Sequence, residues 1–244
     1  MSDGGPRPLA VVTGASRGLG AVIARTLAGK GFDLLLTARD AAALARVESE
    51  LRSFEGRAVA LPGDVTDPMH RGRIAQAVGR SGGLDLLVNN AAIPGPAPAP
   101  ELASVPLEDL ERVYRVNVVA PIAMVQALLP ALRAKGGLVI NVSSDAAVGG
   151  YPHWGNYGAS KAALDLASLT LAHELAPSGI SVVSVDPGEM RTPGAEPLFP
   201  ADEFALRPLP EATVPFWVWL LGQPRAEISG RRFQAQADHW GLPT

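Results

Sequence analysis

The stretch from Leu9 to Lys30 decides the fold. It reads Leu-Ala-Val-Val-Thr-Gly-Ala-Ser-Arg-Gly-Leu-Gly-Ala-Val-Ile-Ala-Arg-Thr-Leu-Ala-Gly-Lys. Residues 9–13 are a short apolar run, which predicts a buried strand, and residues 21–30 carry apolar side chains at helical spacing. Three glycines lie between these two segments and predict a tight turn. A strand, a glycine-rich turn and a helix in this order are typical of a parallel α/β sheet.

The same alternation continues along the chain. Further strands are expected at residues 33–37, 58–61, 84–88, 137–142, 180–185 and 232–235. Helices are expected at 40–54, 67–78, 107–132 (irregular at Pro121), 157–176 and 211–221, with a helical turn at 201–206. Short apolar strands that alternate with helices predict an α/β fold whose sheet is covered on both faces. We expect a loose tail at residues 1–8 and one domain at 9–244, with a substrate loop at about 188–210.

The composition suits a well-buried globular protein. Of the 244 residues, 47% are hydrophobic and 18% are charged, which is enough apolar material for one large core. The net charge is −3 and no block of lysine or arginine is present, so we expect no nucleic-acid partner. There is no cysteine, and the four histidines lack a metal-ligand spacing, so neither a disulfide nor a metal is expected.

Nothing in the sequence predicts a membrane protein. The first eight residues are polar and rich in glycine and proline, without the features of a secretory signal. The longest uncharged run, 116–132, contains polar residues and two prolines and is shorter than the about 20 residues of a membrane span. We therefore expect this run to be a buried helix, and the protein to be cytoplasmic.

The glycine turn predicts a nucleotide site. Glycines between a strand and a helix let a pyrophosphate approach the helix N-terminus, where free N–H groups favour anions. The turn comprises Gly14, Ser16, Arg17, Gly18, Leu19 and Gly20. Its segment from Gly14 to Gly18 also matches the nucleophile elbow of hydrolases. That alternative is weak, because no earlier strand is available to supply an oxyanion loop and Gly20 would have no role.

Two arginines favour NADP(H) over NAD(H). A site specific for NAD usually has an acidic residue at the end of the second strand, where it holds the ribose hydroxyls. Here Arg39 stands in that place, and Arg17 lies in the glycine turn. Two guanidinium groups suit a 2′-phosphate. Asp40 remains an alternative acid for the ribose, although it also suits the N-cap of the next helix.

A serine, a tyrosine and a lysine predict proton transfer to or from a carbonyl oxygen. Ser144 follows the strand 137–142, and Tyr157 and Lys161 lie four residues apart on one helix face. An ammonium about 4 Å away, at an effective dielectric of about 20, favours a phenolate by roughly 4 kcal/mol. We therefore expect the pKa of Tyr157 to fall from about 10 to about 7, where an acid/base catalyst works best. Taken alone, such a pair is more often a helix with a snorkelling lysine.

Taken together, these motifs resemble those of the short-chain dehydrogenase/reductase family. The resemblance covers residues 9–235 and comprises Thr13-Gly14-x-x-x-Gly18-x-Gly20, Asn89-Asn90-Ala91, Asn117, Ser144, Tyr157-x-x-x-Lys161 and Pro187-Gly188-x-x-x-Thr192. It implies a Rossmann-like, doubly wound sheet of about seven parallel strands. It also implies an oxidoreductase that transfers a hydride between a nicotinamide cofactor and a small carbonyl compound or secondary alcohol.

The resemblance also implies a role for each matching residue. Tyr157 is similar to the family's acid/base, Lys161 to the residue that lowers its pKa and binds the nicotinamide ribose, Ser144 to the carbonyl-orienting serine and Asn117 to the holder of a relay water. The remaining cofactor contacts are expected at Asp64, Val65, Asn89, Ala91, Pro187, Gly188 and Thr192, whereas Asn90 is mainly structural. Simpler explanations stay open for three of them: a helix cap or kink for Asn117, a turn for Asp64 and a surface position for Thr192. Ala92 replaces a family glycine and would be strained if that glycine has a positive φ.

The substrate and the assembly are predicted more coarsely. Expected pocket walls are Pro94 and its neighbours to Pro98, Ala146, Tyr151, His153, Trp154, Glu189 and Met190. His153 is either a second base or an ordinary loop residue. Two long apolar helices predict a homodimer or homotetramer. A regulatory module that binds NADP(H) without turnover, and an epimerase or dehydratase on the same scaffold, are the alternative functions.

Overall fold

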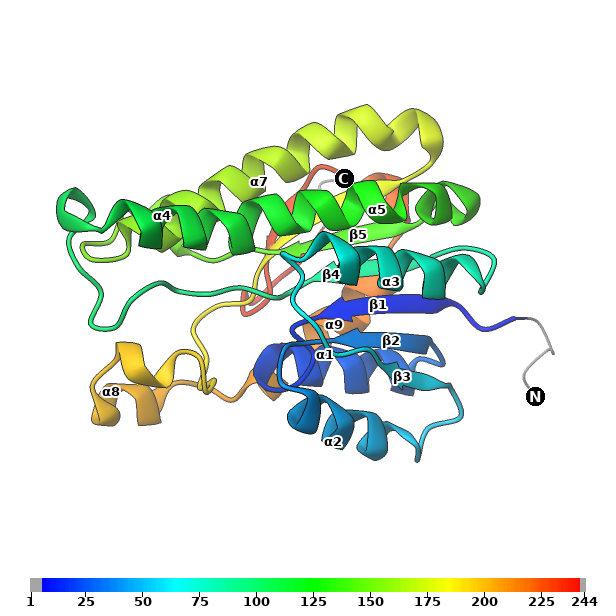
Figure 1. The fold of residues 1–244 in the computed structure, drawn as a ribbon, viewed down its shortest axis with the longest axis horizontal. Helices are drawn as coiled ribbons and strands as arrows, with labels where there is room; N and C mark the ends of the chain where they lie inside the picture. The colour runs from blue at the N-terminus through cyan, green and yellow to red at the C-terminus, as the bar shows by residue number, and fades with distance from the viewer. Residues whose placement is uncertain (1–5, 242–244) are drawn as a thin grey trace.

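A computed structural model describes residues 6–241 of the chain, so most of the predicted tail at 1–8 lies outside it. Its centre is one sheet of seven parallel strands in the order β3-β2-β1-β4-β5-β6-β7 (Figure 1). The strands are β1 Leu9–Thr13, β2 Asp33–Thr37, β3 Ala58–Ala60, β4 Leu86–Asn89, β5 Leu138–Val142, β6 Ser181–Asp186 and β7 Arg232–Gln234. The predicted α/β class and the parallel, doubly wound, Rossmann-like sheet are therefore confirmed.

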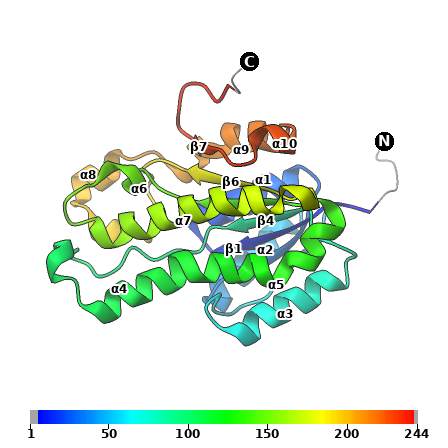
Figure 2. The ribbon, with the colours of Figure 1, turned by 90° about the horizontal axis from the view of Figure 1, so that it is seen from above.

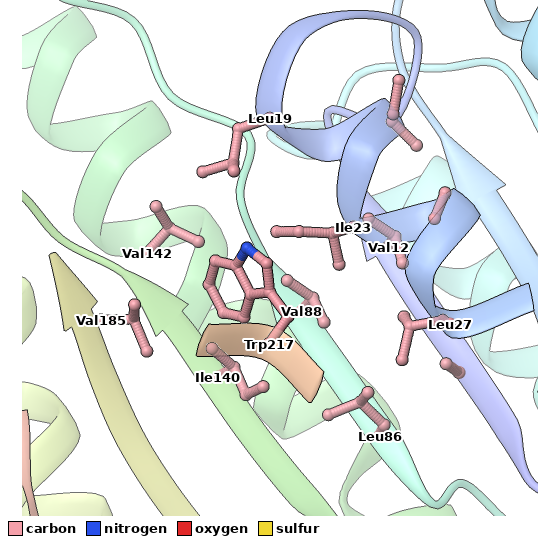
Figure 3. Packing of buried hydrophobic residues seen from close by; sticks show 14 of the residues in the cluster. Val12, Leu19, Ile23, Leu27, Leu86, Val88, Ile140, Val142, Val185 and Trp217 are labelled. Atoms are coloured by element: carbon pink, nitrogen blue, oxygen red, sulfur yellow. The ribbon is translucent and has the colours of Figure 1, made fainter. Parts of the chain in front are cut away.

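Helices cover both faces of the sheet (Figures 1 and 2). One face carries α1 Gly18–Gly29, α2 Ala41–Leu51 and α9 Val214–Leu221. The other face carries α3 Pro68–Gly79, α5 Ala120–Lys135 and α7 Gly155–Leu175. Successive strand side chains point to opposite faces, so Val12 joins the first apolar layer and Val11 the second. In the first layer, Trp217 of α9 packs beside Ile23 of α1 and Val88 of β4 (Figure 3).

The strand order creates a crevice at the carboxyl edge of the sheet. From β1 the chain runs outward to β3, and it then returns to place β4 on the other side of β1. The loops that leave β1 and β4 therefore diverge. Ligands of open α/β sheets bind in such a place, because backbone groups and side chains from both loops converge there. The Gly14 turn and the Asn89–Ala91 segment thus come together, although about 75 residues separate them in sequence.

The predicted helix at 107–132 is divided. It consists of α4 Leu107–Tyr114, a π-helical segment Arg115–Val119 and α5. The irregularity lies just before Pro121, because proline has no N–H to donate to the preceding turn. By length and composition, residues 107–135 would qualify for a membrane span, with 39% of the most apolar window buried. The α5 part packs against α3, β4 and β5, as a core helix does, and core helices pass the same test.

Several short elements were not expected. They are η1 Leu102–Ser104, α6 Ala146–Gly149, η3 Ala176–Ser178, η4 Glu196–Leu198 and α10 Arg225–Ile228. The helix predicted at 211–221 is present as η5 Pro210–Thr213 followed by α9. The helical turn predicted at 201–206 is present as α8 Ala201–Leu206. Two helices begin earlier than predicted, α1 at Gly18 and α7 at Gly155, since glycine is a poor helix former and gives no sign of a helix start. Ala92 is not among the residues with a positive φ in the described chain, so the strain considered for it does not arise.

Candidate active site

Two cavities meet at the carboxyl edge of the sheet. A nucleotide-sized cleft of about 350 Å³ is lined by the β1 and β4 loops, and a second cavity of about 580 Å³ lies beside it. We call them the glycine cleft and the substrate cavity. Tyr157 lines both of them, so a group on its phenol can reach ligands on either side. The other shared lining residues are Ala92, Ile93, Ser143, Pro187, Met190, Thr192 and Gly194.

The glycine cleft needs glycine for steric reasons. Gly14 has a φ of +66°, and a Cβ there would lie 2.8 Å from Nδ2 of Asn90 and 2.9 Å from Cα of Ala91. Asn90 fills this space because its amide donates to the carbonyl oxygens of Thr13 (2.9 Å) and Gly14 (3.2 Å). The side chain therefore ties the β4 loop to the β1 turn. All six predicted turn residues line the cleft: Gly14, Ser16, Arg17, Gly18, Leu19 and Gly20.

The start of α1 suits an anion. Its N-cap, Arg17, provides no side-chain hydrogen bond to the first turn, so the N–H groups there remain available. Arg17 and Arg39 both line the cleft and bring two positive charges. The Asp40 carboxylate instead accepts the N–H of Ala43 at 2.9 Å as the N-cap of α2, which confirms the capping interpretation.

Asp64 and Val65 close the far end of the glycine cleft. The Asp64 carboxylate accepts the N–H and the hydroxyl of Thr66, each at 2.8 Å. Burial by itself raises the pKa of Asp64, but these hydrogen bonds and the positive charge of Arg39 outweigh it and lower the pKa. Asp64 is thus an anionic cleft residue as well as the turn residue that the simpler explanation proposed.

The structure brings Ser144, Tyr157 and Lys161 together. Ser144 follows β5, and the other two lie on adjacent turns of α7. The Lys161 side chain is buried, and its Nζ donates to the carbonyl oxygen of Val142 at 2.7 Å. The same Nζ lies 5.5 Å from the centre of the Tyr157 ring. Strand β5 and helix α7 therefore fix all three groups at the junction of the two cavities.

The ionisation of Tyr157 differs from the prediction. Burial raises the pKa of Tyr157 above its usual value, and the charges of Asp145 and Asp186 raise it further, while its interaction with the Ser144 hydroxyl lowers it in part. Burial also lowers the pKa of Lys161 to about 8, with a partial offset from Asp165. The expected pKa near 7 for Tyr157 is wrong in this structure, because desolvation disfavours both charged forms.

Asp145 is a site residue that the sequence reasoning missed. It lines the substrate cavity, and its carboxylate accepts the Ser144 hydroxyl at 2.9 Å. The Ser144 oxygen in turn accepts the N–H of Ala146 at 3.2 Å. Asp145 also raises the pKa of Tyr151 on the rim of the cavity. A charged residue directly after Ser144 was the available signal.

Aromatic side chains form one wall of the substrate cavity. Trp154 stacks on Phe199 with ring centres 5.6 Å apart and meets Tyr157 edge-on at 5.7 Å. The Arg207 guanidinium lies 3.6 Å from the centre of the Phe199 ring and pairs with Glu189 at 3.3 Å. Sequence reasoning missed Phe199 and Arg207, which lie in the predicted substrate loop. The predicted wall residues that do line this cavity are Pro94, Ala146, Tyr151, Trp154, Glu189 and Met190.

Three predicted site residues lie elsewhere or face differently. His153 is exposed, has a φ of 66° and lines neither cavity. Asn89, predicted to line the cofactor, is buried and donates to Asn141 on β5 at 2.8 Å, whereas Asn90 lines the glycine cleft in addition to its structural hydrogen bonds to the β1 turn. Gly188 lines the substrate cavity and not the glycine cleft. For the two asparagines, side-chain alternation at the end of β4 decides the direction, because a one-residue shift along a strand reverses it.

Asn117 is fully buried in the π-helical segment. Its Oδ1 accepts the N–H of Ile93 at 2.9 Å, and its Nδ2 donates to the Ile93 carbonyl (2.9 Å) and to Ser160 Oγ (3.0 Å). The side chain therefore holds the β4 loop against α7. The structural use of Asn117 is clear from these bonds, and its role with a relay water stays a prediction.

Comparisons with known proteins agree with this geometry. Residues 8–203 match the family model described as short chain dehydrogenase. The rhamnolipid-biosynthesis 3-oxoacyl-[acyl-carrier-protein] reductase of Pseudomonas aeruginosa is 38% identical over 187 residues, 74% of this chain and 72% of that protein. An active-site complex of RhlG from the same species with NADP has a TM-score of 0.82 at 33% identity, covering 93% of this chain and 94% of that one. A Brucella melitensis 3-ketoacyl-(acyl-carrier-protein) reductase complexed with NADH has a TM-score of 0.82 at 27% identity, covering 93% and 96%.

Proposed function

The chain belongs to the short chain dehydrogenase family, and from this premise we propose that it is an NADP(H)-dependent oxidoreductase that interconverts a small carbonyl compound and a secondary alcohol. One observation carries the proposal. Tyr157 lines both the glycine cleft and the substrate cavity, with Ser144 and Lys161 beside it. A proton donor at the boundary between a nucleotide site and a substrate site is the arrangement that carbonyl reduction requires.

The residues of the glycine cleft fit NADP(H). The turn at Gly14 and the start of α1 would hold the pyrophosphate, and Arg17 and Arg39 would hold the 2′-phosphate. Asp40 also lines the cleft, but one of its carboxylate oxygens is engaged in capping α2. The relatives include complexes with NADP and with NADH, so the preference for NADP(H) rests on the two arginines. When bound, the cofactor supplies or accepts the hydride.

Tyr157 is the proposed proton donor. Because the pKa of Tyr157 is raised, its phenol is neutral at pH 7 and carries the proton that the reduced oxygen needs. The Ser144 hydroxyl, now donating to Asp145, turns to donate to the substrate oxygen beside the phenol. The Lys161 ammonium offsets the negative charge that remains on Tyr157 after transfer. These features favour reduction at neutral pH.

Two further proposals concern organisation. Residues 9–244 act as one domain around the single sheet, with residues 188–210 as the substrate loop. The protein forms a homodimer or homotetramer, because large apolar side chains on its two long helical segments are exposed: Val119 by 57%, Leu166 by 67% and Leu169 by 40%. Light scattering tests the assembly, and a monomeric mass would contradict it.

A carbonyl and alcohol panel with NADPH and NADP⁺ tests the function. Loss of NADPH absorbance in step with alcohol formation is the expected result, and an epimerase or dehydratase would produce no such loss. Tyr157→Phe should lower kcat by about 10²- to 10⁴-fold, because the phenyl ring keeps the shape but has no proton to give. NADPH binding, measured by fluorescence, should be retained. Tyr114→Phe, which lies outside both cavities, is the matched control and should keep its rate. Full activity in Tyr157→Phe would refute the assignment.

A further inference from the structure

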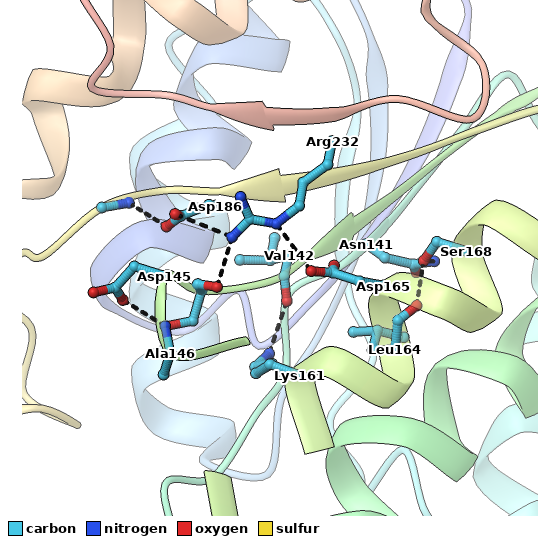
Figure 4. A network of polar contacts seen from close by, with 12 residues as sticks. Asn141, Val142, Asp145, Ala146, Lys161, Leu164, Asp165, Ser168, Asp186 and Arg232 are labelled. Carbon is cyan, nitrogen blue, oxygen red and sulfur yellow. Dashed lines mark hydrogen bonds and ion pairs between the residues drawn. The ribbon is translucent and has the colours of Figure 1, made fainter. Parts of the chain in front are cut away.

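An arginine on β7 is hydrogen-bonded to helix α7, to the end of β6 and to the main chain after β5 (Figure 4). The Nε of Arg232 donates to Asp165 on α7 at 2.9 Å. Its Nη2 donates to the main-chain carbonyl of Ser144 at 2.8 Å and lies 3.3 Å from the carboxylate of Asp186, the last residue of β6. No motif in the sequence marks this arginine, and it lines neither cavity.

We propose that Arg232 is a positioning residue for carbonyl reduction, which holds Ser144 in place and sets the charge next to Lys161 through Asp165. The proposal rests on the function proposed above. It concerns a residue that touches neither ligand and acts through the residues that do.

The first part of the argument is the place of Ser144. Its hydroxyl is fixed by Asp145 and Ala146, but its main chain is fixed by Arg232. Asp186, which pairs with the same guanidinium, accepts the N–H of Gly188 at 2.9 Å. Ser144 and Gly188 stand on the wall of the substrate cavity. One side chain thus joins two loops of that wall, so its loss lets Ser144 move relative to the phenol.

The second part is charge. The side chains of Asp186 and Asp165 are only 3% and 16% exposed, and a buried carboxylate needs a charged partner. Asp165 Oδ1 has no hydrogen-bond partner. The bond that Arg232 donates to Oδ2 is therefore the one that compensates the buried Asp165 carboxylate. Asp165 lies one helical turn after Lys161 on α7 and raises its pKa. The positive charge of Arg232 partly neutralises the Asp165 carboxylate. Arg232 therefore limits how far Asp165 raises the pKa of Lys161.

The charged groups near the Tyr157 phenol and the Lys161 ammonium come from α7 and from the strands that pack against it or continue the sheet beside it. They are Lys161 and Asp165 on α7, Asp145 after β5, Asp186 on β6 and Arg232 on β7. With Arg232 present, one cation faces both Asp165 and Asp186. Without it, two unpaired carboxylates remain next to the site.

Kinetics provide the first test. Arg232→Gln should lower kcat by about 10- to 100-fold, the size of effect that a small misplacement of a reacting group produces. The KM for NADPH should stay unchanged, because no contact of Arg232 reaches the glycine cleft. Arg232→Lys, which keeps the charge, should recover part of the rate. Arg231→Gln is the matched control from the neighbouring position and should keep its rate, since its side chain lies outside both cavities.

A second test does not need turnover. The chain has three lysines, Lys30, Lys135 and Lys161, so NMR of protein labelled at lysine can follow each ammonium. Lys161 should titrate at a pKa of about 8 in the wild type. Its pKa should rise by about 1 unit or more in Arg232→Gln and fall in Asp165→Asn.

The possible outcomes separate clearly. If Arg232→Gln leaves kcat and the Lys161 titration unchanged, the proposal is overturned. If Arg232→Gln does not fold, the double variant Arg232→Gln/Asp165→Asn removes one unpaired charge and should fold with a lowered kcat, whereas a wild-type kcat in it would overturn the role in holding Ser144. If the wild type reduces no carbonyl compound, the proposed function fails, and the NMR titration still decides the link between Arg232 and Lys161.

Discussion

The glycine cleft and the substrate cavity share a wall but are built in different ways. In the glycine cleft, main-chain N–H groups, close glycine contacts and arginine charges form the binding surface. At the junction with the substrate cavity, the reactive groups are the half-buried Tyr157, which lines both cavities, and the buried Lys161, which lines the glycine cleft; the pKa of Tyr157 is raised and that of Lys161 is lowered to about 8. A guanidinium stays charged at all ordinary pH values, whereas Lys161 does not.

This difference separates binding from turnover. Nucleotide binding through backbone groups and arginines should depend little on pH, because none of those groups gains or loses a proton. Turnover should depend on pH, because the charge on Lys161 compensates for the phenolate that forms. The family scaffold thus combines a pH-insensitive half with a pH-sensitive half, and each can be altered without the other.

Among the changes that distinguish binding from turnover, the largest effect is expected at Lys161. Lys161→Met should lower the kcat of reduction by about 10²- to 10³-fold, since it removes the charge beside the developing phenolate. In the wild type the rate should fall as the pH rises above about 8, where the ammonium loses its proton. That limb of the pH–rate profile should be absent in the variant. Lys135→Met, on an exposed helix end, is the matched control. If Lys161→Met still loses activity above about pH 8, another group causes that loss. The proposed contrast between pH-independent cofactor binding and pH-dependent turnover would then be wrong.

A smaller effect, confined to the nucleotide half, is expected at Arg39. Arg39→Asp should weaken NADPH binding by about 10- to 100-fold, the worth of a hydrogen bond between charged groups, with little loss for NADH. The pH–rate profile should keep its shape, because Lys161 is unaffected. Arg80→Asp, an exposed arginine outside the glycine cleft, controls for the change in net charge. Equal losses for NADPH and NADH in Arg39→Asp would overturn the preference for NADP(H).

The smallest expected effect concerns stability. The pKa of Lys161 is about 8 in the folded protein and 10.5 in its unperturbed state, so below pH 8 the fold carries the full cost of the buried charge. Between these values the unfolded chain binds more protons, and stability therefore rises with pH. Lys161→Met should raise the free energy of unfolding at pH 7 by about 1 to 3 kcal/mol, and the gain should shrink towards pH 10. Urea unfolding at both pH values measures it, and a less stable variant at pH 7 would show that the bond to Val142 outweighs the buried charge.

Much of the fold follows from local patterns. The strands at 9–13 and 33–37 and the helical turn at 201–206 were predicted with the observed bounds, because a buried parallel strand is marked by a nearly continuous apolar run. Asp40 and Asp67 cap α2 and α3, and such caps are visible in sequence. An irregularity at Pro121 was predicted, but its π-helical form was not, and the early start of α7 was not visible because glycine gives no sign of a helix start.

The active site was also predictable only where it depends on local sequence. The spacing of Tyr157 and Lys161 placed both groups correctly, but the spacing carries no information on burial, and the predicted direction of the Tyr157 pKa was wrong for that reason. Phe199, Arg207 and Arg232 contact residues more than 15 positions away in sequence, so no local pattern could indicate them. The catalytic and cofactor roles of the individual residues stay predictions.

The sequence by itself determined the order of strands and helices, the glycine turn, the two arginines beside it and the reactive trio, because each depends on neighbours along the chain. Tertiary structure alone decided which asparagine faces the cleft, how Asp145, Asp165, Asp186 and Arg232 surround the trio, and which protonation states the trio adopts. The physical reason is that desolvation and charge act through space, and the distances that govern them exist only after the β5, β6, β7 and α7 segments have packed together.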